Sequence, residues 1–329
     1  MSQNCWLNRY SIFTASATLF LIFAGGMVTS TGSGLAVPDW PLSYGMLMPP
    51  MIGGIFYEHG HRLIAATVGL LTIVLAVWLF LAEKRKWVRM LGLFSIALVC
   101  FQGLLGGLTV LFLLPTAISV GHATLAQIFF STVVTLAVVT SQKWKEGRVL
   151  LPSSHKEKNL LQRLPLWGVI TLAAVFIQLI LGAWMRHSEA GLAVPDFPLV
   201  YGKLFPADLD TFYQGDTPFP VSFETFRFRI YLHYAHRCWA LIVMALIWMT
   251  SLRMVRHLRR EPLLFFSALF MMTAVVAQIL LGALVVWTKK YPLITTSHVV
   301  VGAMLLAGSL IVTLFSFRFR LILSEKDAL

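Results

Sequence analysis

Long apolar stretches, separated by short polar segments, follow one another along the whole chain. Each exceeds the about 20 helical residues that cross the ~30 Å apolar core of a bilayer. With 58% hydrophobic and 12% charged residues and a mean hydropathy of +0.78, an all-α integral membrane protein is expected rather than a soluble one. The pattern predicts eight transmembrane helices, at 11–31, 62–82, 90–111, 117–140, 166–186, 231–252, 263–287 and 294–316.

The charge is uneven along the chain and predicts an orientation. Twenty-six Lys and Arg against 14 Asp and Glu give a net charge of +12. In a soluble protein this excess would suggest nucleic acid, but in a membrane protein basic residues gather in cytoplasmic loops, so no nucleic-acid partner is expected. Eighteen of the 26 basic residues lie near the N-terminus, in 83–89, 142–165 and 253–262, and near the C-terminus. These segments are predicted to face the cytoplasm, and both termini with them.

The chain contains an internal repeat. The segment 32–45, GSGLAVPDWPLSYG, recurs as 189–202, EAGLAVPDFPLVYG, with 10 of 14 positions identical. Each half has an even number of helices and starts on the same side, so the repeats are parallel. We therefore expect two pseudo-symmetric four-helix bundles. The predicted division is an N-terminal bundle at 1–150, a cytoplasmic linker at 151–165 and a C-terminal bundle at 166–329.

Four histidines recur with the repeat and carry the candidate chemistry: His61, His122, His236 and His298. Each is predicted in the first two turns of a helix that descends from the outer side, so all four should lie at one depth. Two facing imidazoles inside a helical bundle commonly hold a haem iron. Zinc or copper would want three or four converging ligands, with His59 or His233 as the extra candidates, and fits less well. A single histidine at the membrane interface is more often a hydrogen-bonded or lipid-facing residue than a metal ligand. The recurrence of all four with the internal repeat favours metal binding.

The two halves differ beside these histidines. The first half reads Glu58-His-Gly-His61-Arg62 and the second His233-Tyr-Ala-His236-Arg237. A residue three positions earlier lies one turn away on the same helix face, so Glu58 is predicted to reach the first haem. Arg62 and Arg237 are candidates for the haem propionates, or else simply snorkel at a helix end. We infer that one bundle does chemistry and the other holds a permanent electron carrier.

Together, the Glu58-x-x-His61-Arg62 motif, the duplicated outer loop, the QxxxG stretches at 102–106 and 278–282, and the paired histidines resemble the haem A synthase family. The resemblance implies oxidation of the C8 methyl group of haem O to a formyl group, giving haem A for terminal oxidases. It implies that His61 and His122 hold the substrate haem O, that His236 and His298 hold a haem B cofactor, and that Glu58 is the essential carboxylate. It also implies a cell (inner) membrane location and haem O synthase as a possible partner. The orientation predicted from the charges puts the haem sites toward the outer side.

One departure from the family concerns the first outer loop. Many bacterial members carry two cysteines there, and the matching positions are Val37 and Ser43. A disulfide is therefore impossible at this site. The Pro-rich loop is either a lid over the pocket or a spacer between helices.

Other functions stay open at the level of sequence. The main alternative is a dihaem electron-transfer protein of the cytochrome b561 kind, which needs the four histidines but not Glu58. A haem exporter or chaperone is a weaker candidate. Membrane lipids are expected partners, and aromatic and glycine faces would allow homo-oligomers. The electron acceptor and the source of the formyl oxygen are not predicted.

Overall fold

The computed structural model describes residues 3–147, 152, 154–213 and 221–327. Eight of its helices are long and apolar enough to cross a membrane, which confirms the predicted all-α, multi-pass fold. They are α1 (Gln3–Ser30), α2 (Gly53–Ala82), α3 (Lys86–Leu111), α4 (Thr116–Thr140), α6 (His155–His187), α7 (Phe223–His257), α8 (Pro262–Trp287) and α9 (Pro292–Asp327). The short elements are α5 (Gln142–Glu146) and the 3-10 turns η1 (Ala190–Leu192) and η2 (Leu209–Phe212).

Four helices begin eight or more residues earlier than the apolar pattern predicts: α1, α2, α6 and α7. Hydropathy detects only the membrane-buried part of a helix, whereas hydrogen bonding and capping set its real start. At α6 the Ser154 side chain accepts a hydrogen bond from the Glu157 backbone, and at α7 Ser222 caps Thr225 in the same way. Residues 155–165 of the linker predicted at 151–165 form the first turns of α6, and the division into domains stays a prediction.

The early starts also correct the expected depth of two histidines within their helices. α2 begins at Gly53 and α7 at Phe223. His61 therefore lies in the third turn of α2 and His236 in the fourth turn of α7, not in the first two turns. His122 and His298 lie in the second turn of α4 and α9, as predicted.

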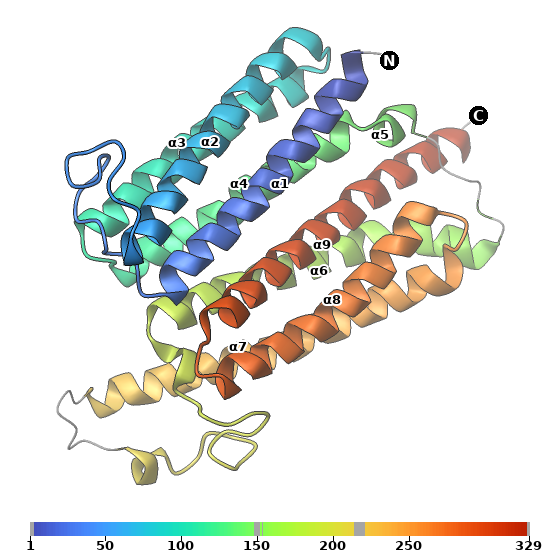
Figure 1. Cartoon of the computed structure of the whole chain (residues 1–329). Coiled ribbons are helices and arrows are strands. Elements are labelled where there is room, and N and C mark those ends of the chain that lie inside the picture. Colours follow the sequence, from blue (N-terminus) through green and yellow to red (C-terminus); the bar gives the residue numbers. More distant parts are fainter. Residues whose placement is uncertain (1–2, 148–151, 153, 214–220, 328–329) are drawn as a thin grey trace.

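The helices pack in two sets (Figure 1). In one set α1 contacts α2, α2 contacts α3, α3 contacts α4, and α4 contacts α1; α6, α7, α8 and α9 contact one another in the same order. The sets meet where α1 and α4 pack on α9 and where α4 packs on α6. More than half of the α4 and α9 spans is buried, 56% and 61%, against 22–33% for the other six, so these two helices lie at the centre.

The two ends of the helices differ. α1 begins and α9 ends at the same end of the molecule, which also carries the turns at 83–85 and 258–261 and helix α5 (Figure 1). We call this the charged end. The loops at 31–52 and 188–213 lie at the opposite end, called the loop end. Helical Ser and Thr hydroxyls in between, such as those of Thr18 and Thr72, donate to the carbonyl four residues earlier, which satisfies them inside the membrane.

Candidate functional site

Each of the four histidines packs its ring edge against a glycine of the preceding long helix. A Cβ atom placed on that glycine would lie 2.9–3.2 Å from the Cε1 atom of the imidazole. The absence of a side chain therefore lets each ring approach the backbone of the preceding helix closely. The four pairs are Gly25 with His61, Gly106 with His122, Gly182 with His236, and Gly282 with His298.

These glycines follow the repeat, as the histidines do. Gly25 and Gly182 differ by the offset of the loop motif, and Gly106 and Gly282 by the offset of the later histidines. The imidazoles of His61 and His122 are close enough for their charges to interact, and so are those of His236 and His298. His122 also interacts with His187, and His236 with His233. The role of the two pairs as haem ligands stays a prediction.

Glutamines hold three of the four rings. The Nε2 atom of Gln178 lies 3.0 Å from the His236 carbonyl oxygen and 3.2 Å from the ring Nε2. Gln102 makes the same contacts with His122, at 3.0 and 3.4 Å, and Gln278 lies 3.5 Å from the ring Nε2 of His298. The position that matches Gln178 in the first half is Leu21, so His61 lacks this partner.

Both rings of the first pair leave polar atoms unsatisfied within the described residues. The Nδ1 atoms of His61 and His122 are buried without a hydrogen-bond partner, as is the Oε1 atom of Gln102. Unpaired buried nitrogens are costly unless a ligand binds them, because proteins satisfy nearly all such groups. The free nitrogens of His61 and His122 would suit binding of a haem iron, whereas the ring nitrogens of His236 and His298 already face glutamine atoms. Within the described residues, no three His, Cys, Asp or Glu side chains gather to hold a metal ion.

The glycine contact makes a matched pair of variants. We expect Gly25→Ala to lower the free energy of unfolding by about 1–3 kcal/mol, since its new methyl group meets His61 at 2.9 Å in a packed interior. Gly69→Ala, in the helix that carries His61, meets nothing within 4 Å and should be neutral or stabilising by up to about 1 kcal/mol. Thermal unfolding of the purified proteins measures both. Equal effects would mean that the His61 contact is not tight.

Glu58 is buried at the loop end of α2, where it joins the helix to the first loop. Its Oε2 atom accepts a hydrogen bond from the Val37 backbone at 2.8 Å, and its Oε1 atom pairs with Arg62 at 2.6 Å. Only 4% of the residue is exposed. The carboxylate is thus one turn from His61 on the same helix and is held by two donors.

Arg62 fastens the first loop to α2. Its Nη1 atom donates to the carbonyl oxygens of Asp39 and Leu42, both at 2.8 Å. In the second half Arg237 donates to Leu199 at 2.9 Å and Val194 at 3.3 Å. Neither contact was predicted from the sequence. A role for these arginines toward haem propionates stays a prediction.

The duplicated loop motif folds in the same way twice. In the first loop Asp39 accepts hydrogen bonds from the Tyr44 and Gly45 backbone, and the Tyr44 hydroxyl donates to Ala36. Asp196 and Tyr201 make the matching bonds in the second loop. The bond from Gly45, with that from Tyr44, lowers the pKa of Asp39. The motif residues are therefore those that close a compact loop.

Val37 and Ser43, which occupy the positions of the two loop cysteines in many bacterial members of the family, make hydrogen bonds in place of a disulfide. Val37, fully buried, gives its backbone N–H to Glu58, and the Ser43 hydroxyl lies 2.8 Å from Nδ1 of His59. His59 therefore faces the loop. The first loop also reaches α3, because a Cβ atom at Gly107 would come within 2.6 Å of the Trp40 ring. Hydrogen bonds and this ring contact hold the loop without a disulfide.

Arg62→Gln should loosen the first loop more than Arg237→Gln loosens the second. The first change leaves the buried Glu58 carboxylate unpaired, which typically costs about 3–5 kcal/mol. The second leaves no such charge, because His233 stands in the place of Glu58. Hydrogen exchange of residues 36–46 and 193–203 in the two variants checks this difference. Equal exchange in both loops would contradict a special role for the Glu58–Arg62 pair.

Sequence reasoning named the histidines but missed most of their supports. The QxxxG stretches at 102–106 and 278–282 contain the glutamine and the glycine that contact His122 and His298. The same spacing at Gln178 and Gly182 marks the third, and a search for residues at the repeat offsets would have found Gly25.

Comparisons with known proteins show the family of this chain. Residues 51–310 match the family described as cytochrome oxidase assembly protein (COX15-CtaA). Three similar proteins are each named "Heme A synthase". That of Alkalihalophilus pseudofirmus is 28% identical over 306 residues, which cover 92% of this chain and 94% of the relative. That of Geobacillus kaustophilus is 26% identical over 89% of this chain and 86% of the relative, and that of Shouchella clausii 28% over 86% and 87%. The resemblance noted from the sequence motifs is confirmed: this chain belongs to the cytochrome oxidase assembly protein family.

Proposed function

We propose that this chain is a haem A synthase, a membrane oxidoreductase that converts haem O to haem A. The observation that carries the proposal is the arrangement of four imidazoles as two pairs, each ring lying on a glycine and repeated between the halves. Relatives that align over nearly the whole chain bear the same name. The reaction oxidises the C8 methyl group to a formyl group. With water as the oxygen source it balances as R–CH3 + H2O → R–CHO + 4 H⁺ + 4 e⁻.

The substrate is assigned to the first half. His61 and His122 would hold haem O, and His236 and His298 would hold haem B, which supplies one-electron transfer when bound. Two differences between the halves support this division. Glu58 occurs where the second half has His233, and Leu21 occurs where it has Gln178. A ligand without a glutamine partner is less firmly oriented, which suits a haem that must enter and leave.

Glu58 is the proposed catalytic residue. The oxidation releases protons at the methyl carbon, and a buried carboxylate one helical turn from an axial ligand is placed to accept one or to stabilise developing positive charge. The Val37 backbone and Arg62 fix its position. They position the carboxylate and are not themselves reacting groups. The first loop, fastened by Arg62 and resting on Gly107, would limit water at this end of the bundle.

The proposed setting is the cell (inner) membrane, with both termini in the cytoplasm and the haem pairs toward the outer side. The basic residues at the charged end support this orientation by the positive-inside rule. Haem O synthase is the proposed source of substrate. The bacterial relatives are consistent with a cell-membrane location.

The haem product tests the proposed function. Cells that make haem O but no haem A would express this chain together with haem O synthase, and their haems would be extracted and separated by chromatography. We expect a haem that carries a formyl group. Unchanged haem O, with two haems still bound to the purified chain, would instead indicate an electron-transfer protein of the b561 kind. Haem O bound by the first half but never oxidised would point to a carrier.

A further inference from the structure

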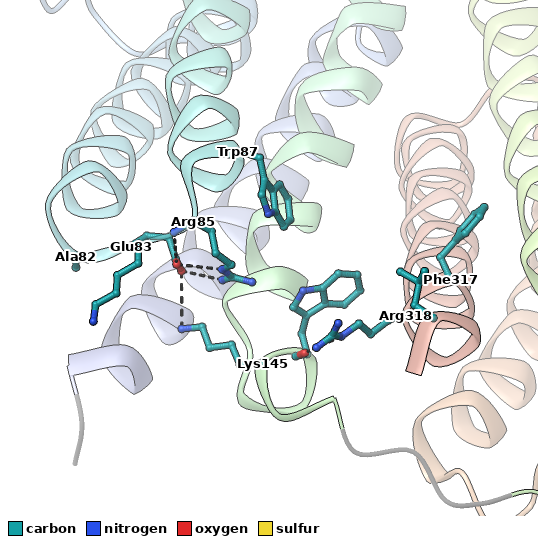
Figure 2. A pocket seen from close by; sticks show the side chains of 10 residues that line it. Ala82, Glu83, Arg85, Trp87, Lys145, Phe317 and Arg318 are labelled. Atoms are coloured by element: carbon teal, nitrogen blue, oxygen red, sulfur yellow. Dashed lines mark hydrogen bonds and ion pairs between the residues drawn. The ribbon is translucent and has the colours of Figure 1, made fainter. Parts of the chain in front are cut away.

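A cavity at the charged end lies far from the histidines along the helices. It has a volume of about 570 Å³, within the range of small-molecule sites. Its walls come from both halves of the molecule: the turn between α2 and α3, helix α5, and the end of α9 (Figure 2). The lining residues used below are Glu83, Lys84, Arg85, Trp87, Trp144, Lys145, Phe317, Arg318 and Leu321.

The cavity has more positive than negative charge. Four cationic side chains line it, Lys84, Arg85, Lys145 and Arg318, against the single carboxylate of Glu83. Arg85 takes both oxygens of this carboxylate, at 2.8 and 3.0 Å, and Lys145 lies 4.0 Å from it. Arg85 holds the pKa of Glu83 down at about 2, so this carboxylate is ionised at neutral pH and already paired with Arg85.

Arg318 has no carboxylate partner among the described residues. It approaches from α9 on the side opposite Glu83 and Lys145 (Figure 2). Its Nε atom lies 3.3 Å from the Trp144 carbonyl, and its guanidinium carbon lies 5.9 Å from the Trp144 ring centre. Burial lowers the pKa of Lys145, and the nearby Arg85 adds to this effect. An anion between Lys145 and Arg318 would offset the cost of this crowding of cations.

The apolar part of the wall indicates what kind of anion. Phe317, Leu321 and Trp87 border the cationic groups and are 44%, 57% and 50% exposed. They lie near the ends of helices that are long enough to cross the membrane, where exposed apolar side chains would meet lipid. Tryptophan is favoured at the membrane interface. A ligand of this cavity therefore has a negative head and an apolar tail. Basic pockets between transmembrane helices are suited to anionic lipid headgroups.

We propose that the cavity binds the phosphate group of an anionic phospholipid, with Arg318 and Lys145 as donors and the acyl chains along Phe317 and Leu321. A guanidinium donates two parallel hydrogen bonds to a phosphate, whereas an ammonium acts as a point charge. Because the wall includes parts of both halves, the lipid joins α9 to the α2–α3 turn and to α5. The site is independent of the haem chemistry at the other end.

Native mass spectrometry of the full purified chain tests the proposal, with dioleoyl phosphatidylglycerol and dioleoyl phosphatidylcholine offered in equal amounts. We expect the anionic lipid to be retained about tenfold more strongly. Arg318→Gln should weaken its binding about tenfold, since a charge-assisted hydrogen bond is lost. Arg320→Gln removes the same charge from an exposed position of the same helix outside the cavity and should leave binding unchanged.

A second variant keeps the test valid if Arg318→Gln does not fold. Lys84 is exposed in the α2–α3 turn, so Lys84→Gln leaves packing intact and should weaken lipid binding about fivefold through charge alone. Equal retention of the two lipids, or equal loss in Arg318→Gln and Arg320→Gln, would overturn the proposal. Sodium phosphate is the third probe. If it displaces phosphatidylglycerol at equal concentration, the cavity is a free-anion site and the lipid assignment is wrong.

Discussion

Glu58→Gln is expected to lower the rate of haem A formation about 100-fold or more, while the protein still folds and binds haem. The glutamine side chain keeps the shape of glutamate and can still accept the hydrogen bond from Val37. It cannot take up a proton or carry the negative charge that pairs with Arg62. Positioned acid–base groups typically contribute 10²–10⁴-fold to a rate, which sets the expected size of the loss. Extracted haems, measured at equal protein level, give the result.

A matched control separates the chemistry from the loss of any buried carboxylate. Glu261 is 3% exposed and pairs with Lys143 at 3.9 Å, at the charged end of the molecule. Glu261→Gln should therefore affect stability but not the yield of haem A per folded protein. Normal haem A formation by Glu58→Gln would remove the assigned catalytic role. A similar loss in both variants would show that the effect arises from stability.

The second large effect concerns the division of labour between the histidine pairs. Removing either proposed ligand of the second pair, by His236→Ala or His298→Ala, should abolish the proposed binding of haem B and with it the activity. His61→Ala or His122→Ala should leave haem B in place and stop conversion of haem O. The reason is that each pair lies on its own two glycines, in a different set of helices.

Spectra of the purified variants and chromatography of their extracted haems measure both properties. His257→Ala is the control, since His257 ends α7 at the charged end, far from either pair. If a second-pair variant keeps full haem B, or a first-pair variant loses it, the two halves do not have the roles proposed here.

The sequence was sufficient for the fold class because the apolar stretches are long and the bilayer sets their length. It failed at helix starts such as that of α6, where a polar first turn is held by the Ser154 cap and not by hydropathy. The four histidines could be predicted as candidates because the repeat places two of them at matching positions in each half. The hydrogen bonds of Arg62 to the loop carbonyls could not, because backbone acceptors leave no pattern of residue types. The cavity at the charged end was equally hidden, since its walls come from segments more than 200 residues apart, such as Glu83 and Arg318.

The central claim is that each histidine pair holds one haem. The most direct measurement is an electron cryo-microscopy map of the full chain purified from cells that make haem O. We predict two porphyrins at the loop end, one ligated by His61 and His122 and the other by His236 and His298. A map with a porphyrin bound elsewhere, or with either histidine pair facing lipid and holding no iron, would contradict the claim.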